Sequence, residues 1–105
     1  MSDLIKNGTC VTLKVGPSIN AKNSQELKEK LRQVFEEGAE RIIIDMSETE
    51  IIDSIGLGLL AATHNSLKSR NSNLELINVR SEIYKVINLM RLDKYFDIST
   101  ADEPS

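Results

Sequence analysis

The chain has 105 residues, of which 40% are hydrophobic and 28% charged, with a net charge of −3. This length suits one domain, so we expect residues 1–105 to form a single domain. The acidic balance argues against a nucleic-acid partner, because binding phosphates requires a basic surface. With one cysteine (Cys10) and one histidine (His64), neither a disulfide framework nor a Cys- or His-rich metal site is expected. The sequence lacks a run of about 18 apolar residues, so we expect a cytoplasmic protein without a membrane partner.

The chain is predicted to begin with a β-hairpin. Two stretches, residues 4–6 and 9–15, flank Asn7-Gly8, a dipeptide typical of tight turns in which both central residues take positive φ. Apolar and polar residues alternate in the second stretch, which predicts a half-buried strand. A loop is predicted at residues 16–20, where a proline ends the strand.

A helix is predicted next, from Asn23 or Ser24 to about Glu37. Asn23 and Glu26 have the spacing of a capping box, in which each side chain bonds the other residue's backbone. Apolar residues recur on one face of this segment, as in a helix that packs on a core. Gly38 is expected to end the helix.

A strongly apolar strand is predicted at residues 41–46. Near-continuous apolar strands are usually covered on both faces, as in a parallel sheet. The strand is followed by a loop at residues 47–53 and by a helix from about Gly56 to Arg70. Within this helix, Gly58 is expected to permit close packing.

The remainder contains a strand at residues 74–79, a helix that Ser81 caps, and a short strand at residues 95–98. The helix is expected to bear Ile83, Val86, Ile87 and Met90. A frayed tail is expected from residue 101 onward. The alternation of strands and helices predicts an α/β fold with a mixed, mostly parallel sheet, an N-terminal β-hairpin and three to four flanking helices.

The segment around Ser54 organises the rest of the chain. It follows an apolar strand and an acidic loop and then opens a helix, so Ser54 lies at a helix start with Gly56 and Gly58 behind it. Backbone N–H groups at a helix start are unpaired and carry partial positive charge, which favours an anion. A phosphoryl group on Ser54 would be such an anion.

Ser54 has three interpretations. A hydrolase nucleophile would need a Gly-x-Ser-x-Gly turn, a histidine and an acid, whereas His64 lies more than two turns further along the same helix. Asp53 or Ser54 can simply cap the helix, which the residues alone favour. In the regulatory interpretation, Ser54 is a phosphoacceptor. We therefore expect a protein that is not an enzyme.

The glycines and acids near Ser54 carry weaker signals. Gly56 and Gly58 match neither a dinucleotide-binding nor a Walker motif, and close packing of the helix on the sheet explains them better. Four acids could ligate Mg²⁺ or Ca²⁺, but their spacing fits no EF-hand loop. These acids are Asp45, Glu48, Glu50 and Asp53. A solvated acidic loop is favoured, so we expect no metal and no cofactor.

Residues 43–46 (Ile-Ile-Asp-Met) and 52–60 (Ile-Asp-Ser-Ile-Gly-Leu-Gly-Leu-Leu) resemble the signature of the STAS domain. More narrowly, the chain is similar to the anti-sigma factor antagonists of bacterial partner-switching systems. The resemblance extends to residues 76–79 and 92–98 and so covers nearly the whole domain.

The resemblance implies a STAS-like fold and a function in signal transduction. Members bind a cognate anti-sigma factor, commonly also a serine kinase of the ATPase-fold type, and so release a sigma factor or another target. The kinase phosphorylates the serine after the motif aspartate, here Ser54. Phosphorylation dissociates the complex, and a PPM-type phosphatase reverses it. The alternative is a STAS subunit that binds a transporter, a signalling assembly or a small ligand without a phosphoswitch.

On this resemblance, the partner-binding surface comprises the start of the helix and the loop after Gly16. Its residues are Asp53, Ser54, Ile55, Gly56, Leu57, Gly58, Ser18 and Asn20. The chain departs from the family pattern in this loop, which often carries an aspartate that helps to meet the kinase. It departs also at Ile55, where Ser or Thr is frequent, and at Arg91, where Gly is frequent.

Overall fold

Seven strands and three helices make up residues 3–100, the part of the chain that the computed structural model describes. The strands are β1 (Asp3–Asn7), β2 (Cys10–Lys14), β3 (Ser18–Ile19), β4 (Arg41–Asp45), β5 (Ile51–Ile52), β6 (Leu74–Val79) and β7 (Asp97–Thr100). The helices are α1 (Ser24–Glu36), α2 (Ser54–Lys68) and α3 (Ser81–Leu89). None of these three is long and apolar enough to cross a membrane. The tail predicted from residue 101 lies outside the described residues.

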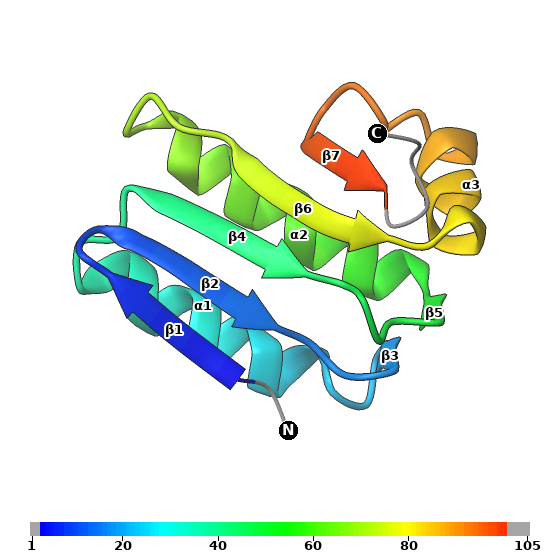
Figure 1. Ribbon diagram of the computed structural model, residues 1–105, viewed down its shortest axis with the longest axis horizontal. Coiled ribbons are helices and arrows are strands. Elements are labelled where there is room, and N and C mark those ends of the chain that lie inside the picture. The colour runs from blue at the N-terminus through cyan, green and yellow to red at the C-terminus, as the bar shows by residue number, and fades with distance from the viewer. Residues whose placement is uncertain (1–2, 101–105) are drawn as a thin grey trace.

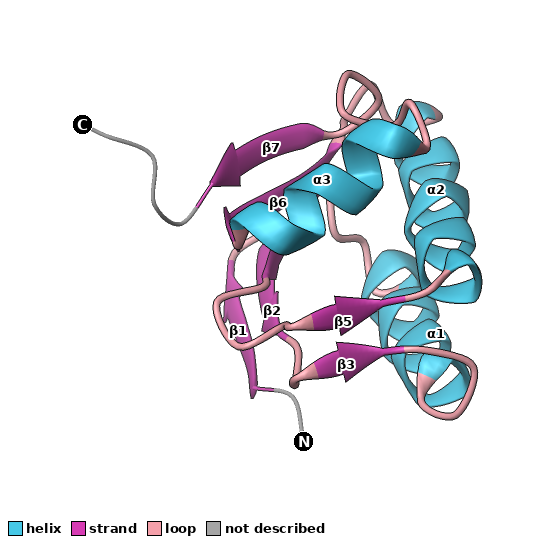
Figure 2. Cartoon of the chain, turned by 90° about the vertical axis from the view of Figure 1, so that its right-hand side faces the viewer, coloured by secondary structure: helices cyan, strands magenta, loops and turns pink. Residues whose placement is uncertain are grey.

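The main sheet is mixed and mostly parallel, which confirms the predicted fold class. Its five strands lie in the order β1-β2-β4-β6-β7, with β1 antiparallel to β2 and the other neighbours parallel. Helices α1 and α2 lie side by side on one face of this sheet (Figures 1 and 2). Helix α3 follows β6 and approaches β5 at the end of the sheet. Among the described residues, the opposite face of the sheet carries no helix.

The core lies between the sheet and the pair α1 and α2. Alternate residues of the central strands point into it, as the period of a strand requires. The helices contribute residues spaced three or four apart. The buried strand residues include Leu13, Ile42, Ile44, Leu74 and Leu76, and the buried helix residues include Leu27, Leu31, Leu57, Leu60 and Leu67.

Strand β4 is covered on one face only, so the expectation of cover on both faces is wrong. Ile42 and Ile44 are fully buried, whereas Ile43 is half-buried on the side without helices. Parallel strands are usually covered on both faces because crossover helices can lie on either side of a sheet. Here α1 and α2 both lie on the same side.

The hairpin turn lies one residue later than predicted. Asn7 pairs with Cys10, so Gly8 and Thr9 are the central residues. Gly8 has φ of 67°, and Thr9 does not take positive φ. Positive φ at the first central position alone is the pattern of a type II′ turn, which favours glycine there.

The last strand begins at Asp97 instead of residue 95. Tyr95 and Phe96 instead form a ring cluster with His64, with centroids 4.3 and 5.7 Å from the His64 ring. Phe96 is only 4% exposed. Burial of these aromatic rings outweighs the strand propensity of the same residues.

The helix boundaries also differ from the predicted ones. Helix α2 begins at Ser54, two residues before Gly56, because Asp53 caps it. In α3, Arg80 takes the N-cap position that was expected of Ser81. Met90 lies just past the end of the helix, at its C-cap, so its predicted place within the helix is wrong.

His64 is a buried packing residue of α2. Its Nδ1 accepts a hydrogen bond from the backbone N–H of Leu74 at 3.1 Å, so the ring is neutral with its proton on Nε2. Burial, together with the nearby charge of Lys68, lowers the pKa of His64 below 6.5, while Asp97 opposes this shift. Protonation at Nδ1 would remove the acceptor for the first residue of β6.

We predict that the free energy of unfolding decreases as pH falls through 6.5, the pKa of an unperturbed histidine. Below that pH the unfolded chain binds a proton at His64 before the folded chain does, so protons favour unfolding. The loss continues until pH reaches the lowered folded-state pKa. Urea denaturation between pH 8 and pH 5 measures it. His64→Gln should be less stable at pH 8 but should show a flatter dependence on pH, and an unchanged slope would contradict this role.

Candidate functional site

Two segments far apart in the sequence lie together at one end of the sheet. Strands β3 and β5 pair in parallel, with Ser18 opposite Ile51 and Ile19 opposite Ile52. The backbone N–H groups of Glu50 and Ile51 also donate to the Pro17 carbonyl, at 2.7 and 3.2 Å. The two predicted parts of the partner surface, the loop after Gly16 and the start of α2, are therefore neighbours.

Asp53 fastens these two segments to each other. Its Oδ1 accepts from the N–H of Gly56 at 2.9 Å, which caps α2, and its Oδ2 accepts from the N–H of Ala21 at 3.2 Å. Its own N–H donates to the Ile19 carbonyl at 3.1 Å. Because both carboxylate oxygens accept hydrogen bonds within the chain, Asp53 holds the two segments of the surface in position.

The loop before α1 is held by two asparagines. The Asn23 side chain accepts from the N–H of Asn20 at 2.9 Å and donates to the Ser18 carbonyl at 2.6 Å. It makes no capping bond to α1, so the predicted pairing with Glu26 is wrong. The side chain stabilises the loop instead of the helix. As a result, Ser18 and Asn20 are positioned by bonds within the loop.

Ser54 is exposed at the first position of α2. Within the described residues its hydroxyl has no hydrogen-bond partner. The first N–H groups of an α-helix have no intrahelical acceptor, and the helix dipole is positive there. The hydroxyl is therefore accessible to another protein, and a charge added to it would meet a favourable helix end.

Two exposed isoleucines lie close to Ser54 in the chain. Ile55 is 53% exposed, and Ile51, which the sequence did not single out, is 62% exposed. Exposed side chains of this size add apolar area that a partner can bury. Successive residues of a strand point to opposite sides, so Ile51 is exposed where Ile52 is buried.

The two glycines of α2 have different surroundings. An added Cβ at Gly56 would lie 2.7 Å from Ile19 Cγ2 and 2.8 Å from the Ile19 carbonyl oxygen. An added Cβ at Gly58 would meet nothing within 4 Å, so the close packing expected at Gly58 is wrong. Gly56 and Leu57 are buried beneath the surface that Ser54, Ile55 and Gly58 form.

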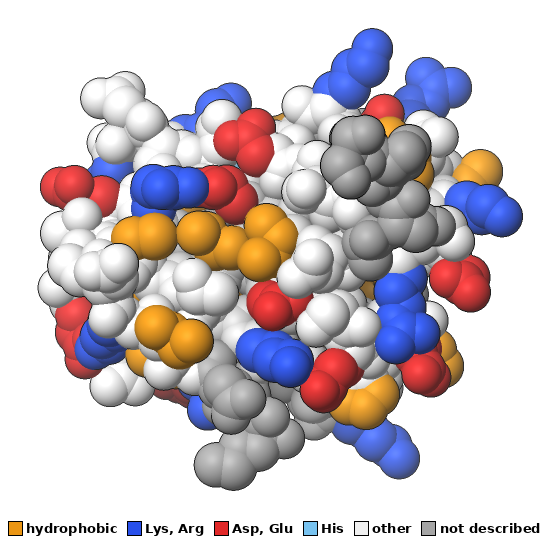
Figure 3. Space-filling view, viewed as in Figure 1, with side chains coloured by type: hydrophobic (Ala, Val, Ile, Leu, Met, Phe, Trp, Pro, Cys, Tyr) orange, Lys and Arg blue, Asp and Glu red, His pale blue; other side chains and the backbone are white. Residues whose placement is uncertain are grey.

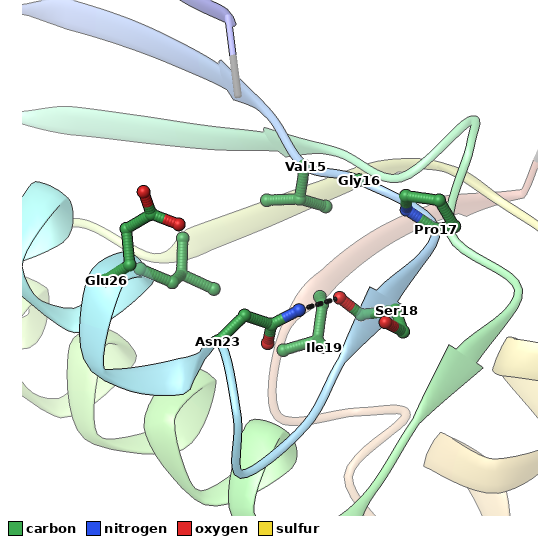
Figure 4. Close-up of a pocket in the computed structure, with 8 residues that line it drawn as sticks. Val15, Gly16, Pro17, Ser18, Ile19, Asn23 and Glu26 are labelled. Atoms are coloured by element: carbon green, nitrogen blue, oxygen red, sulfur yellow. Dashed lines mark hydrogen bonds between the residues drawn. The ribbon is translucent and has the colours of Figure 1, made fainter. Parts of the chain in front are cut away.

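A shallow pocket of about 220 Å³ lies beside this surface (Figure 4). It is lined by residues 15–19, by Asn23 just before α1, and by Glu26 and Leu27 in the first turns of α1. The side-chain amide of Asn23 already donates to the Ser18 carbonyl. The pocket thus lies between the loop after Gly16 and α1. Its described lining does not offer a convergent set of free polar groups.

The four acids near Ser54 bind different groups of the chain and do not converge on one point. Asp45 accepts from Asn78 Nδ2 at 3.1 Å and from the N–H of Ser47 at 3.0 Å. Glu48 lies 3.3 Å from Lys14, and Glu50 lies 3.9 Å from Arg80. Within residues 3–100, no three His, Cys, Asp or Glu side chains gather as metal ligands would.

Arg91 explains one departure from the family pattern. It has φ of 61°, just after the end of α3, and its N–H donates to the Asn88 carbonyl. This left-handed conformation is the usual end of a helix and is easiest for glycine. An arginine at this position therefore adopts the backbone geometry for which the family frequently uses glycine.

The family model for the STAS domain matches residues 2–103. The chain belongs to the STAS domain family. It is 26% identical to the anti-sigma-B factor antagonist of Bacillus subtilis over 101 residues, which cover 96% of this chain and 92% of that protein. It is 31% identical to the anti-sigma-F factor antagonist RsfB of Mycobacterium tuberculosis over 90 residues, which cover 86% of this chain and 72% of that one.

Solved structures share this STAS fold. An anti-sigma factor antagonist from Mycobacterium paratuberculosis superposes with a TM-score of 0.83 at 23% identity, covering 94% of this chain and 84% of that one. The Bacillus cell fate determinant SpoIIAA in its phosphorylated form has a TM-score of 0.74 at 18% identity, covering 95% and 92%.

We predict opposite effects of adding a methyl group at the two glycines of α2. Gly56→Ala should destabilise the fold by about 1–3 kcal/mol, because its Cβ collides with Ile19. Gly58→Ala should stabilise it by about 0.5–1 kcal/mol, because alanine loses less backbone entropy in a helix. Urea denaturation compares the two variants. Equal effects would contradict the close contact between α2 and β3.

A second prediction concerns the two bonds of Asp53. Asp53→Ala removes the helix cap and should cost about 1–2 kcal/mol. Asp53→Asn retains one oxygen that can accept from Gly56 but offers an NH₂ group in place of the other. Amide hydrogen exchange should therefore show Gly56 protected and Ala21 exposed in Asp53→Asn, and both exposed in Asp53→Ala. Unchanged exchange at Ala21 in both variants would contradict the fastening role.

Proposed function

We propose that this STAS protein is a phosphorylation-controlled anti-sigma factor antagonist. In its unphosphorylated form it binds a cognate anti-sigma factor that is also a serine kinase of the ATPase-fold type, and a PPM-type phosphatase restores that form. The observation that carries this proposal is the exposed, unbonded hydroxyl of Ser54 at the start of α2. The names of the relatives, which are anti-sigma factor antagonists, support the same function.

The surroundings of Ser54 favour a phosphoacceptor over a catalytic nucleophile. The histidine of the chain is buried, and its Nδ1 is occupied by the N–H of Leu74. It follows Ser54 by ten residues on the same helix, so it cannot take the Ser54 proton. We therefore propose a binding protein without catalytic activity of its own, acting in the cytoplasm.

Phosphorylation would change the surface and leave the fold intact. A phosphoserine carries about −1.5 to −2 charges at neutral pH. The helix start stabilises such a charge by about 0.3–1 kcal/mol, whereas the adjacent Asp53 carboxylate repels it. Within the described residues the Ser54 hydroxyl makes no hydrogen bond, so no bond of the fold depends on it.

The switch would then act at the interface with the anti-sigma factor. Two exposed apolar side chains lie close to Ser54 in the chain, with Ile55 53% exposed and Ile51 62% exposed. A docked partner that covers these side chains also removes water from Ser54. An unpaired charge in such a dry surface costs several kcal/mol, and each ~1.4 kcal/mol changes affinity tenfold.

We predict that Ser54→Asp weakens binding to the anti-sigma factor at least tenfold, while Ser54→Ala binds and resists phosphorylation. The control is Ser81→Asp, because Ser81 is also an exposed serine at the first position of a helix. Titration calorimetry uses the purified anti-sigma factor kinase encoded in the same genome, and labelling with ATP tests the phosphoacceptor. The unfolding free energy of Ser54→Asp should stay within about 1 kcal/mol of the wild type.

Two outcomes would count against this proposal. Equal affinities for Ser54→Asp and the wild type would refute control by charge at the interface. Binding without labelling of Ser54 would favour the alternative, a STAS subunit that binds its partner without a phosphoswitch.

A further inference from the structure

Strand β1 leaves one backbone edge open. In residues 3–100, β1 pairs with β2 and with no other strand, so it forms an edge of the main sheet. Its two large apolar side chains are exposed, Leu4 by 39% and Ile5 by 64%. An exposed edge with apolar side chains is a template for pairing with another strand.

The turn determines which backbone groups point outward. Asn7 and Cys10 flank a two-residue loop, so this pair exchanges both backbone hydrogen bonds. Hydrogen-bonded and non-bonded pairs alternate along an antiparallel ladder. Ile5 therefore bonds Thr12 of β2, whereas the N–H and C=O groups of Leu4 and Lys6 point away from the sheet.

A row of side chains leads from this edge across the face without helices. Ile5 lies opposite Thr12, and Thr12 lies opposite Ile43 of β4. Figure 3 shows apolar side chains on this face with an acid and a base above them. Arg41 of β4 and Glu75 of β6 form an ion pair at 2.7 Å across these two strands. The row is thus apolar at its β1 end and charged only further inside.

The geometry points to a second copy of this chain as the occupant of the edge: we propose that two copies pair antiparallel through β1, about a two-fold axis at Ile5. Leu4 of each copy then lies opposite Lys6 of the other, and each pair exchanges two backbone hydrogen bonds. Ile5 faces its own counterpart in a non-bonded pair, where side chains approach most closely. The two sheets become one continuous sheet.

Other two-fold registers are less favourable. An axis at Lys6 would place two ammonium groups directly opposite each other, which destabilises a strand pair. An axis at Leu4 would pair fewer of the five residues of β1. With the axis at Ile5, each Lys6 keeps its ion pair with Glu37, just past α1 of its own copy, and lies opposite an apolar leucine.

This pairing would leave the Ser54 surface free. β1 lies at one edge of the sheet, whereas β5 and the start of α2 lie away from it at the carboxyl end of the strands (Figures 1 and 2). The inference therefore does not depend on the function proposed for Ser54.

Sedimentation velocity of the purified chain tests the pairing. One strand pair buries less than a standard interface, so we expect a weak dimer with a dissociation constant of roughly 10 µM to 1 mM. Ile5→Asp should raise this constant at least tenfold. The control, Ile51→Asp, changes an equally exposed isoleucine away from the edge and should leave it unchanged. Leu4→Pro removes an outward N–H that the monomer does not use, so it should abolish the dimer and retain the fold.

Cross-linking tests the register. With Cys10 replaced by serine, oxidised Ile5→Cys should give a disulfide-linked dimer, because directly opposed non-bonded residues lie about 4.5 Å apart between Cα atoms. Ile51→Cys in the same background should give no disulfide-linked dimer, because Ile51 lies away from the paired edge. A wild-type chain that remains monomeric at about 1 mM would overturn the proposal. So would a dimer that Ile5→Asp and Leu4→Pro leave intact, or one that Ile5→Cys fails to cross-link.

Discussion

The two hydrogen bonds of the Asp53 carboxylate hold the candidate site together. One oxygen caps α2 at Gly56, and the other binds the N–H of Ala21 in the loop before α1. A carboxylate is suited to this because it accepts at both oxygens and carries a charge that the helix dipole favours. Without it, the start of α2 and the loop after Gly16 would be connected mainly by the short pairing of β3 with β5.

Close approach of α2 to β3 complements this bond. The backbone at Gly56 lies so near Ile19 that a side chain would collide with it. Because Gly56 has no side chain, the start of α2 packs directly on β3. The cap formed by Asp53 sets the direction of α2. Ser54 is thus carried on a rigid helix start, and a partner that recognises it would meet a surface with little conformational entropy left to lose.

Local patterns in the sequence predicted most of the fold. Alternation located β2, and apolar spacing located α1 and α2, because each pattern reports burial within one element. The paired strands β3 and β5 were missed, since strands of two residues depend on a partner more than thirty residues away. Tyr95 and Phe96 were assigned to a strand because their contacts with His64 are equally remote in sequence.

The candidate site was predicted only in part, because local patterns do not report contacts between residues that are remote in the sequence. The Asp-Ser-x-Gly motif indicated the helix start and the exposed Ser54, but it could not separate residues that face outward from those that face inward. Ile51 was missed because alternation over two residues gives no reliable phase. The inward role of Asp53 toward Ala21 depends on a loop whose path no local pattern describes.

The division between inward and outward residues at the start of α2 has a consequence for divergence among related proteins. Asp53, Gly56 and Leu57 maintain the fold, whereas Ile55 and Gly58 are exposed, and a Cβ added at Gly58 would meet no atom within 4 Å. A duplicated copy of this protein could therefore change its exposed residues, and with them its choice of partner, at little cost in stability. Separate signalling circuits in one cell could then stay insulated while sharing the same scaffold.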